Sequence, residues 1–208
     1  MVSISDVKNL LLRAMDPWSF SLLAPSLEAV TLPAKRVLGA AGAKIEWVYF
    51  PDDGMLSIVS HQRLRRDVEM GVIGREGMSG VSLLLGDAVA SSETNVQIAG
   101  HGWRIDAKSL MSAARVSPAL QDLLLLYARA LEIQTSSTIV ANARGNLEQR
   151  LARWLLMSHD RADGDRLEIT HAFLATMLAA RRPGVTVALH VLEGRHLIRS
   201  LRGQVIIL

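Results

Sequence analysis

The chain has 208 residues, half of them hydrophobic, and a formal net charge of +3, so it can bury one large core or two small ones. It contains no cysteine, which excludes disulfides, thiolate zinc sites and cysteine-ligated iron–sulfur clusters. No apolar run approaches the roughly 18 residues of a membrane helix, and the N-terminus lacks the order of a signal peptide. We therefore expect a soluble, cytoplasmic protein with no membrane partner.

The charge is unevenly distributed along the chain. Residues 1–141 carry 13 Lys and Arg against 14 Asp and Glu, whereas residues 142–208 carry 10 arginines and no lysine against 6 acids. A basic segment is the electrostatic footprint of nucleic-acid binding, although a solvated basic face is the commoner explanation.

The first part of the chain combines a helical segment with many short strands. Residues 3–25 have helical apolar spacing that Pro17 interrupts, and from Leu27 to Asp106 short β-branched runs alternate with Gly, Pro and Asp. This texture predicts a small barrel or sandwich, with one short helix at Met78–Leu85. The predicted strands are Ala29–Leu32, Ile45–Phe50, Met55–Ser60, Val68–Ile73, Thr94–Ile98 and Gly102–Ile105.

A long helix is predicted from Ser117-Pro118 to about Ala141, and it carries two apolar stripes. The residues of the first step alternately by four and three, the spacing of a coiled-coil seam: Leu120, Leu124, Tyr127, Leu131, Gln134, Thr138 and Ala141. The second stripe lies beside it: Leu123, Leu126, Ala130 and Ile133. We expect one stripe to pack on the β domain and the other on a second copy of the helix, and we place the dimer interface on the seam from Leu120 to Thr138. Burial of the whole helix in its own chain is the alternative.

The C-terminal part is predicted to be mostly helical. Asn142–Asn146 contains Gly145 and is a predicted hinge, Leu147–His159 is a predicted amphipathic helix, and Leu167–Ile169 is a predicted short strand. At the end of the chain, Leu197–Arg199 and Gln204–Leu208 flank Arg202-Gly203 as two strands and a turn.

The stretch Thr170–Glu193 predicts two short helices around a tight turn. Thr170 is a predicted N-cap, and Phe173, Leu174, Met177 and Leu178 give the first helix one apolar face. Pro183 suits the first position of the second helix, which runs to about Leu192 and leaves Gly184, Val187 and His190 facing outward. This is the helix-turn-helix arrangement, whose second helix can enter a DNA major groove. A helical hairpin of another kind of domain is the alternative.

The order of these parts resembles the Crp/Fnr superfamily of bacterial transcription regulators. Four stretches look like its DNA-binding domain: L-E-Q-R-L-A-R-W-L-L, D-R-A-D-G-D-R-L-E-I-T-H, R-R-P-G-V-T-V-A-L and L-E-G-x-x-L-I-R. Two others, V-Y-F-P-D-D-G and G-V-I-G-R-E-G-M-S-G, look like its cyclic-nucleotide-binding-type barrel. The resemblance implies an α+β fold with three parts. These are a jelly-roll barrel with an N-terminal helix over residues 1–116, a dimerisation helix and hinge over 117–145, and a winged helix-turn-helix over 146–208.

The resemblance also implies a function. A homodimer would bind a palindromic site on double-stranded DNA, with RNA polymerase as a further partner. We expect Arg182 to contact guanine O6 and N7, Arg181 a base or phosphate, and Val187 a thymine methyl group. The other expected DNA contacts, to bases or to phosphates, are Thr170, Gly184, Thr186, His190 and Arg202.

The barrel departs from those family members that bind cyclic AMP. They use a Gly-Glu-Leu run and, some ten residues on, an Arg-Ser pair, whereas this chain has Met78-Ser79-Gly80 and Ala90-Ser91-Ser92-Glu93 there. Because no arginine stands between Arg75 and Arg104, a cyclic phosphate would lack its bidentate partner, and Glu93 would repel it. We therefore expect no cyclic nucleotide and predict no cofactor.

An effector pocket is still expected in the barrel. Arg75 with the amides of residues 77–80 is a candidate anion site, although a structural arginine in a turn is commoner, and haem ligation through His61 or His101 is left open. The candidate pocket residues are Arg75, Glu76, Gly77, Met78, Ser79, Gly80, Ser91 and Ser92.

Two residues of the winged domain stand where the family has residues that tolerate positive φ. Ala179 occupies a turn position where glycine is usual, and His196 a position where Gly or Asn is usual. A left-handed backbone at Ala179 would cost about 1–2 kcal/mol relative to glycine.

Two other classes of function compete with DNA binding. We expect no enzyme, because the chain has no G-x-S-x-G, H-E-x-x-H or Walker motif and Gly71, Gly74 and Gly77 do not form the dinucleotide fingerprint. The second class is a ligand- or partner-binding regulatory module with a vestigial cyclic-nucleotide pocket that does not act through DNA.

Overall fold

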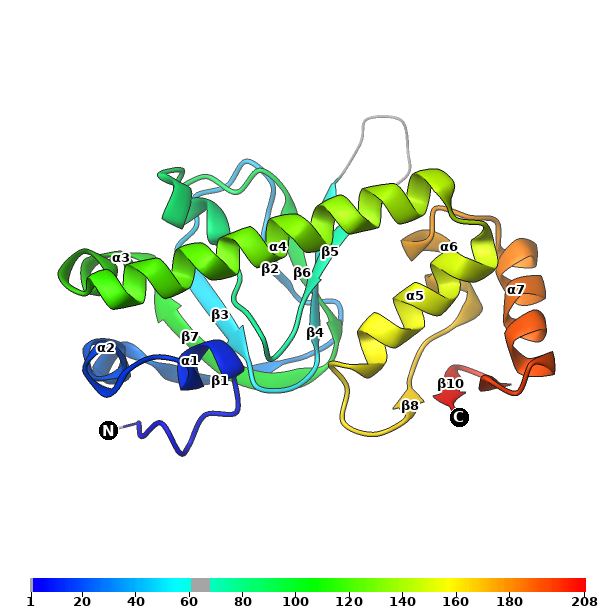
Figure 1. Ribbon diagram of the computed structural model, residues 1–208, viewed down its shortest axis with the longest axis horizontal. Coiled ribbons are helices and arrows are strands. Elements are labelled where there is room, and N and C mark those ends of the chain that lie inside the picture. Colours follow the sequence, from blue (N-terminus) through cyan, green and yellow to red (C-terminus); the bar gives the residue numbers. More distant parts are fainter. Residues whose placement is uncertain (1, 61–67) are drawn as a thin grey trace.

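The computed structural model describes residues 2–60 and 68–208, which form a β-barrel domain, a long helix and a smaller C-terminal domain (Figure 1). The α+β fold expected from the sequence is confirmed. No helix in these described ranges is long and apolar enough to cross a membrane.

The N-terminal segment forms two short helices, α1 (Leu10–Arg13) and α2 (Pro17–Leu23), followed by a single 3-10 turn, η1 (Ala24–Ser26). The break falls at the predicted proline, because Asp16 caps α2 by accepting hydrogen bonds from the amides of its first turn. Asn9 attaches the segment to the barrel, since its Nδ2 donates to the carbonyls of Pro51 (2.8 Å) and Gly77 (2.9 Å).

The barrel consists of two antiparallel sheets with strand orders β1-β7-β3 and β2-β6-β4-β5. The strands are β1 (Glu28–Leu32), β2 (Val37–Gly39), β3 (Trp47–Pro51), β4 (Met55–Ser60), β5 (Val68–Ile73), β6 (Glu93–Ile98) and β7 (Gly100–Asp106). Each predicted strand is found within two residues of its expected ends. The prediction missed β2, because three residues are too few to show alternation. The short helix expected at Met78–Leu85 is a 3-10 helix, η2 (Val81–Leu85).

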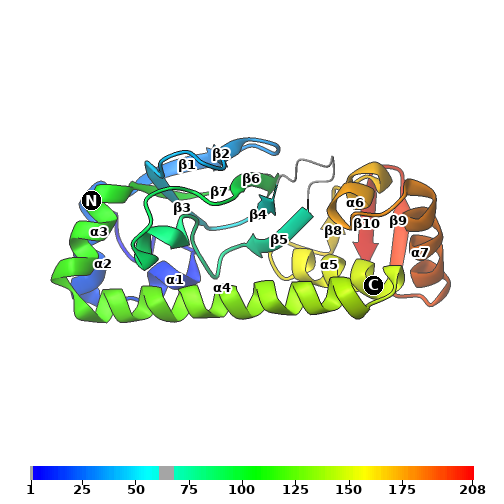
Figure 2. The same ribbon diagram turned by 90° about the horizontal axis from the view of Figure 1, so that it is seen from above.

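Helix α3 (Ala107–Val116) leads into α4 (Pro118–Arg144), which runs beside the whole barrel and reaches the C-terminal domain (Figure 2). Ser117 starts α4: its Oγ accepts a hydrogen bond from the Leu120 amide at 3.1 Å and lies 2.8 Å from the Ser19 hydroxyl.

The placement of the dimer interface on the first stripe of α4 is wrong, because that stripe faces the chain's own barrel. Tyr127 donates a hydrogen bond from its hydroxyl to the Met78 carbonyl (2.9 Å), and Gln134 accepts one from the Val72 amide (2.8 Å). Two of the predicted residues are fully buried and the others are buried or half-buried: Leu120, Leu124, Tyr127, Leu131, Gln134 and Thr138. The exposed apolar residues of α4 lie on another face, which includes Leu126 at 69% exposure and Ile133 at 51%.

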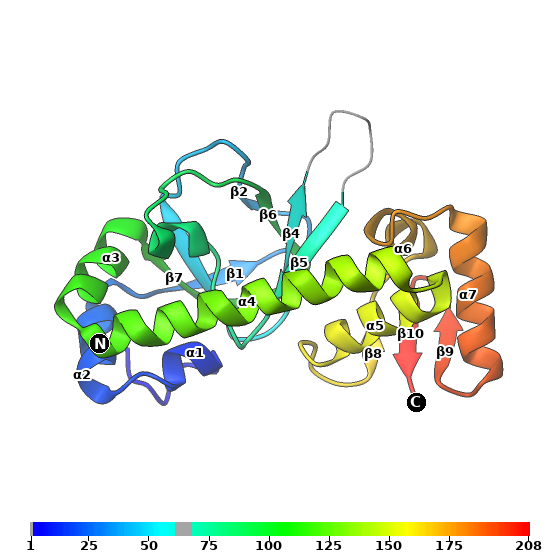
Figure 3. The same ribbon diagram turned by 45° about the horizontal axis from the view of Figure 1, so that its top comes forward.

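The C-terminal domain begins with α5 (Leu147–His159), for which Asn146 and Gln149 form a reciprocal capping box. Its other elements are β8 (Arg166–Leu167), α6 (His171–Met177), α7 (Arg182–Gly194), β9 (Ile198–Leu201) and β10 (Gln204–Ile207). The three strands pair antiparallel in the order β8-β10-β9. The helices pack together around one apolar core, and α7 lies on the outer side of the domain, away from the barrel (Figure 3).

Candidate nucleic-acid interface

Helix α7 has one buried and one exposed face. Val185, Ala188, Leu189 and Leu192 are each at most 4% exposed and pack in the domain core, whereas Val187 is 61% exposed on the opposite side. His190 is also exposed, as expected. Gly184 is only half-buried rather than outward, and a Cβ added there would lie 3.1 Å from Leu147 of α5. Gly184 therefore lets α7 approach α5 closely.

The turn between α6 and α7 has the strained geometry expected from its sequence. Ala179 has φ of 45° and His196, just after α7, has φ of 57°, so both adopt the left-handed backbone that the family resemblance implied. The Ala179 and Ala180 amides donate to the carbonyls of Thr176 (3.1 Å) and Ala175 (2.9 Å). Arg150 of α5 donates to the Leu178 carbonyl. These bonds hold the turn against the cost of a left-handed alanine.

Two exposed arginines stand at the start of α7. Arg181 is the N-cap residue, and its side chain makes no capping hydrogen bond, while Arg182 is the first helical residue. The Val185 amide donates to the Arg181 carbonyl (3.2 Å), so the Gly184 amide is the candidate for a phosphate contact. Positive side chains therefore coincide with the positive end of the helix dipole, which suits a polyanion.

The remaining predicted DNA contacts fall into two groups. His190 and Arg202 have exposed side chains, with His190 Nδ1 lying 3.7 Å from Glu193 Oε2 and Arg202 lying in the turn between β9 and β10. Thr170 and Thr186 already have partners within the domain. Thr170 Oγ1 caps α6 by accepting from the Phe173 amide (3.2 Å), and Thr186 Oγ1 donates to the Arg182 carbonyl (3.2 Å).

His171 is a further polar residue of this region that the sequence did not single out. It is the first residue of α6 and is half-buried. Its Nδ1 lies 3.0 Å from Thr186 Oγ1 on α7, and its Nε2 lies 3.4 Å from Ser200 Oγ on β9. The stretch D-R-A-D-G-D-R-L-E-I-T-H ends at His171, but the sequence assigns this residue no role, because its partners lie 15 and 29 positions away in the chain.

The barrel contains a pocket of about 340 Å³. Of the predicted effector residues, Ser79, Gly80, Ser91 and Ser92 line it. Much of the remaining lining is apolar, with Trp47, Ile58, Met70, Ile73 and, from α4, Leu131. Among the described residues that line it, the charged ones are the exposed Lys44 and Glu46, and none is an arginine.

The other predicted effector residues do not line this pocket, and the assignment of Arg75, Glu76, Gly77 and Met78 to it is wrong. Gly77 and Met78 are buried against Tyr127 and the core, where a Cβ on Gly77 would lie 2.2 Å from the Tyr127 hydroxyl. The side chains of Arg75 and Glu76 extend toward the C-terminal domain.

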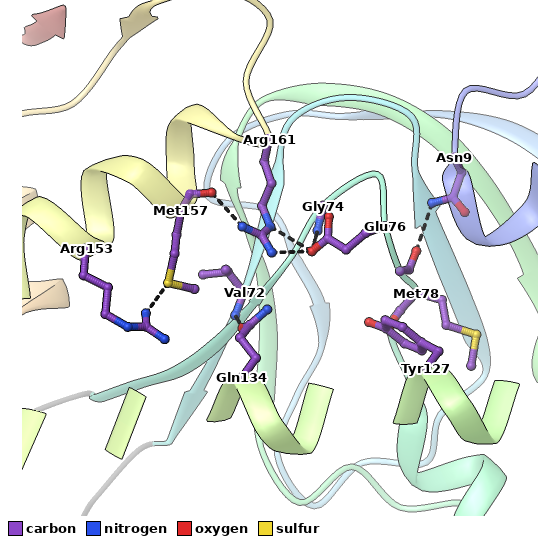
Figure 4. Close-up of polar contacts among 11 residues, drawn as sticks. Asn9, Val72, Gly74, Glu76, Met78, Tyr127, Gln134, Arg153, Met157 and Arg161 are labelled. Carbon is purple, nitrogen blue, oxygen red and sulfur yellow. Dashed lines mark hydrogen bonds and ion pairs between the residues drawn. The ribbon is translucent and has the colours of Figure 1, made fainter. Parts of the chain in front are cut away.

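Arg75 and Glu76 join the two domains, and Figure 4 shows Glu76 with its partner Arg161. Arg161, two residues beyond the end of α5, donates from Nε to Glu76 Oε1 at 2.8 Å and from Nη1 to the Met157 carbonyl at 2.7 Å. Arg75 donates to the Ala162 carbonyl at 3.3 Å and lies 3.4 Å from the Asp163 carboxylate. Arg75 is therefore a structural arginine, as the alternative interpretation held.

A buried carboxyl group reinforces this junction. Glu69 of β5 is 7% exposed, and its oxygens accept hydrogen bonds from Ser57 Oγ (2.6 Å) and from Nε1 of Trp154 on α5 (2.8 Å). Burial raises its pKa to about 7. Met55 and Val72 of the barrel belong to the same apolar cluster as the core of the C-terminal domain, so the two domains are packed together.

Of the two histidines considered for haem, the structure describes only His101. His101 has a side chain that is 72% exposed and lies 3.6 Å from Asp53, away from the pocket lining. His61 lies outside the described residues.

Comparisons with known proteins agree with this architecture. Residues 149–208 match the family model of the Crp-like helix-turn-helix domain. No curated protein matches the chain in sequence. A solved structure from Eubacterium rectale, assigned to the Crp/Fnr family of transcriptional regulators, has 16% identity and a TM-score of 0.73 over 95% of this chain and 93% of that one.

Two further solved structures are similar over most of the chain. FixK2 from Bradyrhizobium japonicum has 14% identity and a TM-score of 0.72, covering 87% of this chain and 92% of its own. The c-di-GMP-responsive global regulator CLP from Xanthomonas campestris has 16% identity and a TM-score of 0.68, covering 92% and 99%. At such identities these likenesses show the fold. The chain thus has the fold of Crp/Fnr regulators and ends in a Crp-like helix-turn-helix domain.

Proposed function

We propose that this chain, with its Crp-like helix-turn-helix domain on the Crp/Fnr fold, is a transcription regulator that binds palindromic DNA as a homodimer. The observation that carries the proposal is the outer side of α7, where Arg181 and Arg182 stand exposed at the helix N-terminus and Val187 is exposed one turn further on. A helix with a free face and cations at its start suits a major groove.

We propose the following roles for the residues of this surface. Arg182 reads a guanine, Arg181 contacts a base or phosphate, and Val187 packs on a thymine methyl group. His190 extends the same exposed face, while the Gly184 amide and Arg202 contact phosphates. Thr170 and Thr186 are weaker candidates for direct contact, because their hydroxyl groups already cap and brace helices.

Homodimer formation is supported by the exposed face of α4. Leu126, Ala130, Ile133, Ser137 and Val140 step by four, three, four and three residues, the spacing of a coiled-coil seam, and all five are exposed. Pairing α4 with its copy about a two-fold axis would bury this stripe. Two α7 helices would then read half-sites about 34 Å apart, one turn of DNA.

We propose that the effector, if the barrel binds one, is not a cyclic nucleotide. A pocket of about 340 Å³ is large enough for a small ligand, but the described residues of its lining offer no guanidinium to hold a phosphate in bidentate fashion. We therefore do not propose for this chain the c-di-GMP response of the Xanthomonas regulator. The mixed lining of serines and apolar side chains suits a mostly uncharged molecule.

The experiment that tests the function is selection of binding sites from a random pool of duplex DNA, followed by titration of the selected site at several salt concentrations. We expect a palindromic consensus and an affinity that falls steeply with salt, since each neutralised phosphate contributes about −0.9 to the slope of log K against log salt. Absence of any selected consensus would favour the regulatory module that acts through protein partners. We propose that the protein has no catalytic activity. We also propose that it acts in the cytoplasm, because the DNA that it would bind is there.

A further inference from the structure

Three elements of the C-terminal domain meet at the imidazole of His171. The ring belongs to α6, its Nδ1 lies 3.0 Å from Thr186 Oγ1 on α7, and its Nε2 lies 3.4 Å from Ser200 Oγ on β9. Of these elements, α7 and the turn that follows β9 carry the proposed DNA contacts. His171 itself is half-buried between them rather than directed to solvent.

The hydrogen-bonding roles form a consistent chain. The Thr186 hydroxyl gives its proton to the Arg182 carbonyl (3.2 Å), so its oxygen is left to accept one from Nδ1–H of His171. In this tautomer the Nε2 atom is an acceptor, and the Ser200 hydroxyl can donate a hydrogen bond to it. Both ring nitrogens of His171 then have a hydrogen-bond partner.

A second link ties the same strand to α7. The Ser200 amide donates to Oε1 of Glu193, near the C-terminal end of α7, at 2.9 Å. Strand β9 is therefore joined to α7 twice, at Glu193 directly and at Thr186 through His171. Two contacts at different positions along α7 fix the angle between β9 and the helix, whereas a single contact would let β9 rotate about it.

We propose that His171 is a positioning residue for DNA recognition, which clips α7 to the wing strand so that both meet DNA in one fixed register. The proposal rests on the DNA-binding function proposed above. Base contacts come from Arg182 and Val187 on α7, and backbone contacts come from Arg202 in the turn that follows β9. Thr186 serves this clip and reads no base.

The test compares His171→Ala with the wild type on a selected site and on random duplex DNA. Loss of two hydrogen bonds predicts a roughly tenfold fall in the ratio of the two affinities. His171→Asn, whose amide can replace Nδ1 toward Thr186, should recover part of this ratio. Hydroxyl-radical footprints should lose protection under the wing while keeping it under α7.

A double-mutant cycle identifies the role of Thr186. Thr186→Val removes the hydroxyl at nearly constant volume, and we expect it to lower the ratio in the wild type but to add little in the His171→Ala background. Additive losses would mean that Thr186 reads DNA independently, which overturns the clip.

Two further outcomes separate the clip from the function on which it rests. If the wild type selects a site and folded His171→Ala keeps the full affinity ratio, with only its unfolding temperature lowered, His171 is merely structural and the proposal is wrong. If the wild type itself selects no site, the proposed function fails instead.

Discussion

Oε1 of Glu69, in barrel strand β5, accepts a hydrogen bond of 2.8 Å from Nε1 of Trp154, in the first helix of the C-terminal domain. This contact joins residues 85 positions apart and lies inside the junction of the two domains. The barrel and the C-terminal domain are thus docked through a buried polar pair as well as through apolar packing.

Removing the donor of this pair should loosen the docking. Trp154→Phe keeps an aromatic ring against Phe173 but leaves a buried carboxyl oxygen without its partner, which costs about 1–3 kcal/mol. Urea unfolding measures the loss, and Trp18→Phe, at a half-exposed surface ring, serves as the control for removing a tryptophan. Equal stability of the two variants would show that the Glu69–Trp154 bond contributes nothing.

The stability of the docked arrangement should depend on pH through Glu69. Burial raises its pKa from 4.5 to about 7, while hydrogen bonds from Ser57 and Trp154 and the positive charges of Arg161 and Arg153 oppose that rise. Because the charged form is disfavoured only where Glu69 is buried, its contribution is most favourable below about pH 4.5 and is lost as the pH rises to about 7.

The matched variant for this pH effect is Glu69→Gln, which keeps the side-chain shape and cannot ionise. We expect the unfolding free energy of the wild type, relative to the variant, to fall between pH 4.5 and about pH 7. Subtracting the unfolding free energy of Glu69→Gln at each pH removes the contributions of all other titrating groups. A difference that stays constant over this range would contradict the raised pKa.

Gly74 should be intolerant of a side chain because of the domain junction. A Cβ there would lie 2.4 Å from Cγ of Arg161 and 2.8 Å from Glu76 Oε2, so Gly74→Ala must displace the ion pair. We expect a loss of about 1–3 kcal/mol in thermal or urea unfolding. Gly39→Ala, where nothing lies within 4 Å of the added Cβ, is the control and should change little.

The elements of the fold were largely predictable from the sequence, because turn residues and periodicity mark their ends. Leu147–His159 was predicted with the bounds that the structure has, and so were Met55–Ser60 and Val68–Ile73. The positive φ at Ala179 was implied by the family resemblance.

What the sequence could not decide was which partner each surface meets. Both stripes of α4 are apolar, and only the three-dimensional position of the barrel shows that Leu120 and Leu124 face inward while Leu126 stays exposed. Likewise, Arg75 and Glu76 stand next to pocket residues in sequence, yet their side chains contact a loop more than 80 positions later. Such contacts leave no local pattern.

Dimerisation should depend on the exposed stripe of α4. Ile133→Glu places a charge in the middle of the proposed seam, where its burial without a partner would be costly, and should yield a monomer in sedimentation or light scattering. Gln121→Glu, at an exposed position of the same helix outside the stripe, should leave a dimer. A dimeric Ile133→Glu variant would place the interface elsewhere.

The most direct test of the account is the affinity of Arg182→Ala for the selected site and for random duplex DNA, measured beside Arg202→Ala at several salt concentrations. We predict that Arg182→Ala loses about 1–3 kcal/mol on the selected site and relaxes one base position, whereas Arg202→Ala weakens binding on both DNAs and lowers the salt slope by about one. An equal loss on both DNAs for Arg182→Ala would contradict base reading by α7.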